Sequence, residues 1–307
     1  MTEFALATRR IVHGNAALIW TVAGSAVLLA IAVYTSASME GALSARVGGL
    51  SAVGAALIAT LCTAVATGAG ALPVLLARTI SARTQTAMLG FSAGVMLAAS
   101  VFSLLLPAID AATAMTGSTI RGGLLAAAAL LLGATLLMLM DKIVPHEHEA
   151  QGTHGLHSSR AIRRVWLFVF AITLHNVPEG LAIGVAFGGE SVSAGLPVAL
   201  GIGLQNMPEG LAVALAMLTL KYSPMHAVLI ALATGLVEPL GGLLGAGAMA
   251  ISGSVLPWGL GFAAGAMLFV ISHEMIPESH RNGNETSATV GLFAGFVLMM
   301  LFDTALS

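Results

Sequence analysis

Nine long apolar stretches dominate this chain, and they constrain its fold more than any other feature. They cover about residues 15–35, 48–77, 85–108, 119–140, 164–187, 193–219, 224–250, 256–277 and 286–305. Each is long enough to cross the hydrocarbon core of a bilayer, which takes about 20 apolar residues in a helix. Because lipid offers no partner to backbone polar groups, the stretches predict an all-α, polytopic transmembrane helix bundle of nine spans.

The composition agrees with a protein surrounded by lipid. Of the 307 residues, 57% are hydrophobic and 8% are charged, whereas soluble domains carry about 25% charged residues. The 36 glycines favour close helix packing in a membrane. The net charge of −2 and the absence of a basic block give no indication of nucleic-acid binding. We therefore expect the lipid bilayer, and no nucleic acid, among the partners.

Positive charges divide unequally between the two sides of this layout. If the N-terminus is cytoplasmic, ten Lys and Arg residues lie on the inner side and two on the outer side. The inner residues are Arg9, Arg10, Arg78, Arg83, Lys142, Arg160, Arg163, Arg164, Lys221 and Arg281, and the outer ones are Arg46 and Arg121. The positive-inside rule favours this orientation, with the C-terminus on the outer side.

The layout predicts that the chain has two parts. Residues 1–47 are expected to comprise a cytoplasmic tail, one transmembrane helix and an outer loop, and residues 48–307 an eight-helix domain. A polar stretch at about 142–163 is predicted to be a cytoplasmic loop. Four histidines in it are candidates for metal capture, although a solvated loop explains them equally well: His146, His148, His154 and His157.

A near-repeat in two successive spans is the most informative motif. The segment 175–182 reads HNVPEGLA, and 205–212 reads QNMPEGLA. Each places a glutamate deep in an apolar helix, which costs roughly 2.5–3.5 kcal/mol for a lone charge. His175 and Glu179 are four residues apart, as are Gln205 and Glu209, so each pair shares a helix face. The proline before each glutamate frees a backbone carbonyl as a further oxygen.

A third acid, Glu238, precedes Pro239 in the seventh span. No intramembrane Lys or Arg accompanies the three glutamates, so they must be protonated or surround a cation. Imidazole with carboxylates favours Zn²⁺, Fe²⁺, Mn²⁺ or Cd²⁺ over Mg²⁺ and Ca²⁺. Kink prolines with polar helix contacts, or a proton relay, are the alternatives to a metal site.

These residues resemble the ZIP (ZRT/IRT-like) family of divalent metal transporters, and within it the bacterial GufA-like branch. The pattern His-Asn-x-Pro-Glu-Gly followed by x-Asn-x-Pro-Glu-Gly carries the resemblance, which extends over about residues 48–305. The first span lies outside the usual eight of the family, and a member from Bordetella carries such a helix as well. The resemblance implies a transporter, and not an enzyme, in the bacterial inner (plasma) membrane, with the C-terminus periplasmic.

The resemblance also implies a two-metal site, import into the cytoplasm, and a sliding motion of one helix bundle against another. The implied ligands of the transported ion are His175, Glu179, Gln205 and Glu209, with Met96, and those of the second ion are Asn176, Asn206 and Glu238. Glu179 and Glu209 are able to bridge the ions. Zn²⁺ is the expected substrate, without an organic cofactor. Gln205 stands where histidine is common in the family, and this weaker ligand favours a broader specificity that includes Cd²⁺.

Acidic groups near the span ends suggest a path for the ion. Asp110 and Asp303 would form an entrance on the outer side, where their field attracts cations. Asp141, His273 and Glu274 would form an exit on the inner side. The segment 272–274, Ser-His-Glu, resembles an exit site of the family. His273 and Glu274 do not form a zincin motif, because position 277 is proline.

Other functions are compatible with the same residues. A metal exporter or proton antiporter would use an identical centre, and an intramembrane metal-dependent hydrolase would add a metal-bound water and a general base. A metal sensor would bind without net flux. A homodimer is one option for the assembly.

Overall fold

A bundle of long helices makes up the part of the chain that the structure describes. The structure is a computed structural model that describes residues 50–76, 81–143, 157–189, 195–280 and 283–306. Its α-helices are α2 (Ala52–Ala71), α3 (Ala82–Ala98), α4 (Leu106–Thr116), α5 (Thr119–Ile143), α6 (His157–Phe187), α7 (Gly195–Thr219), α8 (Pro224–Gly235), α9 (Glu238–Ile251), α10 (Leu256–Val270), α11 (Ile276–His280) and α12 (Glu285–Leu306). Two short 3₁₀ helices, η1 (Leu72–Leu75) and η4 (Gly253–Val255), adjoin α2 and α10.

Eight helical segments of the described residues are long and apolar enough to cross a membrane. They correspond to the second to ninth predicted spans, which confirms a polytopic all-α bundle. The predicted first span at 15–35 lies outside the described residues. Large apolar side chains on α5, such as Leu124, Leu131 and Leu132, are exposed, as expected for a surface that faces lipid rather than water.

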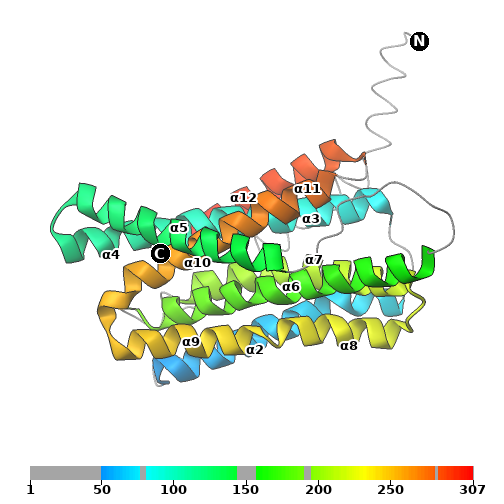
Figure 1. Cartoon of the computed structure of the whole chain (residues 1–307), viewed down its shortest axis with the longest axis horizontal. Coiled ribbons are helices and arrows are strands. Elements are labelled where there is room, and N and C mark those ends of the chain that lie inside the picture. The colour runs from blue at the N-terminus through cyan, green and yellow to red at the C-terminus, as the bar shows by residue number, and fades with distance from the viewer. Residues whose placement is uncertain (1–49, 77–80, 144–156, 190–194, 281–282, 307) are drawn as a thin grey trace, which may run out of the picture.

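The helices form two groups that do not follow the order of the chain. The first group contains α2, α6, α7, α8 and α9, and the second contains α3, α4, α5, α10, α11 and α12 (Figure 1). Within the first group α2 packs on α7 and α6 on α9, and within the second α3 packs on α12 and α5 on α10. The groups meet mainly where α3 lies against α7 and α10 against α6.

Glycines bring the helix backbones of each group into direct contact. A Cβ atom at Gly90 of α3 would lie 2.1 Å from the Ala288 carbonyl oxygen of α12. At Gly180 of α6 it would lie 2.0 Å from the Glu238 carbonyl oxygen of α9. Only a residue without a side chain allows such approach, which is the usual way in which small residues hold membrane helices together.

Two π-helices interrupt the second group, and each comes just before a proline. The segment η2 (Ala99–Leu105) joins α3 to α4, and η5 (Ile271–Met275) joins α10 to α11. Pro107 and Pro277 stand at the second positions of the helices that follow. A proline has no N–H and crowds the preceding turn, and a wider π turn accommodates this inside a continuous helix. The predicted ends at 108 and 277 were therefore too early, because the spans extend to Thr116 and His280.

The span predicted at 224–250 is confirmed as one span, Pro224–Ile251, but it consists of two helices, α8 and α9. A turn at Leu236 and Val237, both with right-handed helical backbone angles, separates the two helices, and α9 begins at Glu238. Pro239 has no N–H to donate to the Gly235 carbonyl four residues earlier, which explains a break in the helical hydrogen bonds at this point. The break places the Glu238 carboxylate in the first turn of α9, where the helix dipole favours a negative charge.

The polar stretch predicted at 142–163 is partly helical. α5 continues to Ile143, and α6 begins at His157. Residues 144–156 lie outside the described residues. The prediction placed the start of the helix near residue 164, where the apolar run begins, but a helix can extend beyond the hydrocarbon core with polar residues in its first turns.

Candidate metal centre

Seven polar residues predicted from the near-repeat and from the third acid lie together inside the first group. We call them the polar cluster: His175, Asn176, Glu179, Gln205, Asn206, Glu209 and Glu238. All seven are buried, and Glu179, Gln205, Asn206 and Glu238 are 0% exposed. They come from α6, α7 and α9, and Pro178 and Pro208 lie within continuous helices. The two halves of the near-repeat thus face one another.

Helix α7 connects the members of the cluster. The Gln205 amide nitrogen donates to Glu179 Oε1 of α6 at 2.6 Å. The Asn206 amide nitrogen donates to Glu238 Oε1 of α9 at 2.7 Å and to the Thr63 carbonyl oxygen of α2 at 3.2 Å. Amide side chains at consecutive positions of α7 therefore hold carboxylates from two different helices.

Three further residues, which were not predicted from the sequence, also contact the cluster. Ser92 of α3 donates its hydroxyl to Glu209 Oε1 at 2.7 Å, and Thr63 of α2 donates to Glu238 Oε2. The Thr234 carbonyl oxygen, at the end of α8, accepts from the Asn176 amide at 2.7 Å. Hydroxyl residues are common where membrane helices pack, so only the tertiary arrangement distinguishes these from the rest.

The cluster retains buried atoms that lack a partner. Of the five buried side-chain polar atoms without a hydrogen bond among the described residues, four belong to it. They are His175 Nδ1, Glu179 Oε2, Gln205 Oε1 and Asn206 Oδ1. Unpaired buried groups of this kind are costly and need an explanation. Carboxylate, amide and imidazole atoms are also those that ligate late divalent metals.

The charge of the cluster points in the same direction. It holds three carboxylates, whereas the sequence from Val165 to Leu220 and from Tyr222 to His280 contains no Lys or Arg. Uncompensated carboxylates in an apolar interior are strongly unfavourable, so a proton or a metal cation must neutralise them. One divalent cation and one proton would balance the three negative charges, and two divalent cations would leave one positive charge over.

The side chains do not form a preassembled ligand set. Among the described residues, no group of three or more His, Cys, Asp and Glu side chains is arranged to hold a metal ion. The carboxylates face amide and hydroxyl donors instead, as the contacts of Glu179, Glu209 and Glu238 show. Ligation of an ion would therefore exchange some of these hydrogen bonds for metal bonds.

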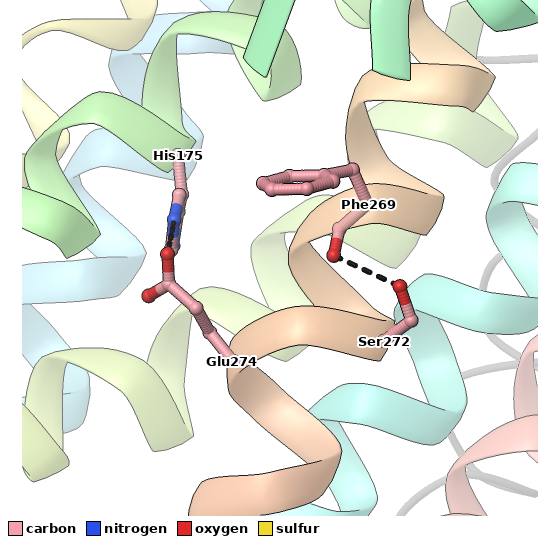
Figure 2. A network of polar contacts seen from close by, with 4 residues as sticks. All are labelled: His175, Phe269, Ser272 and Glu274. Atoms are coloured by element: carbon pink, nitrogen blue, oxygen red, sulfur yellow. Dashed lines mark hydrogen bonds and ion pairs between the residues drawn. The ribbon is translucent and has the colours of Figure 1, made fainter. Parts of the chain in front are cut away.

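A contact across the two groups joins the cluster to a predicted exit residue. Oε1 of Glu274, in η5, lies within hydrogen-bond distance of His175 Nε2, at 3.0 Å (Figure 2). The side chains are 6% and 23% exposed for His175 and Glu274. His273 is exposed and its ring stacks on Phe269 with centroids 5.1 Å apart. Glu274, one of the predicted exit residues, therefore contacts the cluster directly.

The remaining predicted residues lie apart from the cluster or outside the description. Asp141 is near the end of α5. Asp303 of α12 accepts from the Ser103 hydroxyl of η2 at 2.6 Å, and Asp110 is exposed on α4. Met96 is buried on α3, one turn after Ser92 and on the same helix face. His146, His148 and His154 lie outside the described residues, and His157 begins α6.

A polytopic helical bundle with carboxylates buried in its interior is typical of membrane proteins that bind or conduct cations within the bilayer. The family model described as ZIP Zinc transporter matches residues 141–303. The chain is 50% identical over 254 residues to zinc transporter ZIPB of Bordetella bronchiseptica, covering 83% of this chain and 82% of that protein. It is 47% identical to zinc transporter GufA of Myxococcus xanthus, covering 83% of this chain and 100% of that protein.

A more distant relative is zinc transporter ZIP11 of Homo sapiens, 33% identical over 84% of this chain and 99% of that protein. The chain belongs to the ZIP family of zinc transporters, in its bacterial GufA-like branch. It is a multi-pass membrane protein and a divalent metal transporter. The resemblance of the segments 175–180 and 205–210 to the family pattern implied this class.

Proposed function

We propose that this protein carries Zn²⁺, and with it other late divalent ions such as Cd²⁺, Fe²⁺ or Mn²⁺, across the bacterial inner membrane into the cytoplasm. The observation that carries the proposal is the polar cluster on α6, α7 and α9, with three carboxylates and four unpartnered buried atoms. The relatives of the protein reported above are named zinc transporters, and this supports Zn²⁺ as the transported ion.

The cluster divides into two ligand sets. His175, Glu179, Gln205 and Glu209, with Met96, would bind the transported ion, and Asn176, Asn206 and Glu238 would bind a second ion. Both sets contribute unpartnered atoms, because Glu179 Oε2 and Gln205 Oε1 fall in the first and Asn206 Oδ1 in the second. Glu179 and Glu209 lie on α6 and α7 at matching positions of the near-repeat, so they are the carboxylates suited to bridge two ions.

The route through the protein begins and ends in the second group. Asp110 and Asp303 would attract the ion on the outer side by their negative field. Glu274, in contact with His175, would receive the ion as it leaves the cluster, with His273 and Asp141 further along. The histidines His146, His148, His154 and His157 would capture metal on the inner side.

Metal flux into proteoliposomes tests the proposal. Zn²⁺ uptake by the wild-type protein should be saturable, and Glu179→Ala and Glu209→Ala should each reduce it to the background of empty liposomes, because each removes a charged ligand. Glu285→Ala is the matched control, since this acid is exposed at the start of α12. Uptake that survives both changes in the cluster would refute an ion path through it.

The direction of transport needs a separate measurement. Flux is followed with the metal gradient imposed inward and then outward, with and without a pH gradient. Net inward movement down a metal gradient at equal pH supports import, whereas flux that requires an opposing proton gradient supports an antiporter. Metal-dependent cleavage of a peptide or lipid without flux would instead indicate a hydrolase.

A further inference from the structure

Ser92 donates its hydroxyl group to a carboxylate on another helix. It is 0% exposed on α3, and its Oγ lies 2.7 Å from Glu209 Oε1 and 3.3 Å from the Gln205 carbonyl oxygen. A serine hydroxyl has one hydrogen to donate, and the shorter distance assigns it to the carboxylate. The contact is therefore a hydrogen bond to the Glu209 carboxyl group, and such a bond is strongest when that group is ionised.

Two other buried hydroxyls, those of Ser100 and Thr60, behave differently. Ser100, two turns further along the same segment and also 0% exposed, donates to the Met96 carbonyl oxygen of its own helix at 2.7 Å. Thr60 likewise bonds the Ala56 carbonyl oxygen at 2.8 Å. This return to the preceding turn is the ordinary choice of Ser and Thr within helices. Ser92 reaches instead to a carboxylate on another helix.

The contact also crosses between the two helix groups. Ser92 belongs to the second group through α3, and Glu209 to the first group through α7. The other carboxylates of the polar cluster receive donors from their own group, Glu179 from Gln205 and Glu238 from Asn206 and Thr63. Among the described donors to the three carboxylates of the cluster, Ser92 is therefore the one that depends on how the groups are placed relative to one another.

We propose that Ser92 is a positioning residue that orients the Glu209 carboxylate for the transported ion, an inference that rests on the proposed function. A donor on one carboxylate oxygen fixes the rotation of the group and leaves the remaining lone pairs directed to a metal. Partners that orient metal ligands in this way are worth about 10- to 100-fold in metal affinity or activity. Because the donor sits on the opposite group, the site reaches full affinity only while α3 faces α7 at this register.

The test compares Ser92→Ala with Ser100→Ala in the full-length protein. Both variants remove one buried hydroxyl from the same continuous span, so their effects on packing are matched. Zn²⁺ binding to the purified protein is measured by calorimetry, and initial Zn²⁺ uptake into proteoliposomes gives KM and the maximal rate. Ser92→Ala should raise the Kd and KM for Zn²⁺ about 10- to 100-fold, and Ser100→Ala should leave both near the wild-type values.

Several outcomes would overturn the inference. If Ser92→Ala keeps the wild-type Kd and KM while Glu209→Ala abolishes flux, transport through the cluster stands and the role of Ser92 does not. If Ser92→Ala lowers only the maximal rate and the folded fraction, its contribution is packing. Wild-type flux in Glu209→Ala would refute the proposed function itself.

Discussion

Gly180 of α6 offers a sharp test of how the polar cluster depends on backbone contact. A Cβ atom at this position would lie 2.0 Å from the carbonyl oxygen of Glu238 and 2.7 Å from its carbonyl carbon. Real Cβ contacts under 3.0 Å are essentially absent from proteins. In Gly180→Ala the main chains of α6 and α9 must therefore separate by about 1 Å, and overpacking of this kind costs about 1–3 kcal/mol.

The expected loss of transport follows from the neighbours of Gly180. Glu179 precedes it in the chain and Glu238 faces it, so the separation moves two carboxylates of the cluster apart. Misplacement of reacting groups by about 1 Å costs about 100-fold in enzymes, and we expect Zn²⁺ flux to fall about 10- to 100-fold on the same geometric grounds. Intrinsic helix propensity alone would predict that Gly180→Ala stabilises the folded protein, because alanine is favoured over glycine in a helix by about 1 kcal/mol.

The assay measures initial Zn²⁺ uptake into proteoliposomes and the thermal unfolding of the purified protein. The matched control is Gly247→Ala in α9, where an added Cβ would meet nothing within 4 Å. That variant should keep wild-type flux and unfold at an equal or higher temperature, whereas Gly180→Ala should lose flux and unfold at a lower temperature. Wild-type flux and stability in Gly180→Ala would show that α6 and α9 do not touch in this way.

Three further predictions concern single contacts. Glu274→Gln should lower the maximal Zn²⁺ flux about tenfold, because it removes the charge that faces His175; unchanged flux would exclude Glu274 from the exit. Asp303→Asn should raise KM at low ionic strength and less so at about 1 M salt, where surface fields are screened; a shift independent of salt would contradict steering. Thr63→Val should weaken Zn²⁺ binding about tenfold by removing the hydroxyl that donates to Glu238, and calorimetry that shows wild-type affinity would refute this support.

Much of the bundle was predictable because its physics is carried by single helices. Eight of the nine apolar runs lie in the part of the chain that the structure describes, and each corresponds to a span there, since length and hydropathy act along the chain. The prolines were harder to interpret. The predicted span ends at about 108 and 277 fall beside Pro107 and Pro277, but the preceding π turns let the helices continue. Whether a proline ends, bends or widens a helix depends on neighbouring helices, which a linear pattern does not contain.

The candidate centre was predictable to a similar extent. Glu179, Glu209 and Glu238 stood out because a carboxylate in an apolar span is costly wherever the helix packs. Ser92 and Thr63 did not, because a hydroxyl in a membrane helix is unremarkable until the helix opposite it is known. Their roles depend on the register between helices, which only the tertiary structure supplies.

The glycine contacts have a mechanical consequence for the bundle. Wherever an added Cβ would lie within 3 Å of backbone atoms on another described helix, that helix belongs to the same group, as at Gly94, Gly184, Gly210 and Gly265. Between the groups, the close neighbours of Gly201 and Gly259 are side-chain atoms of Met299 and Val185. Deforming a group would pull closely packed main chains apart, whereas displacing one group along the other would meet side chains and break the contacts Ser92–Glu209 and His175–Glu274. We therefore expect the bundle to resist deformation within a group more than displacement along the interface between the groups, which passes between Ser92 and Glu209.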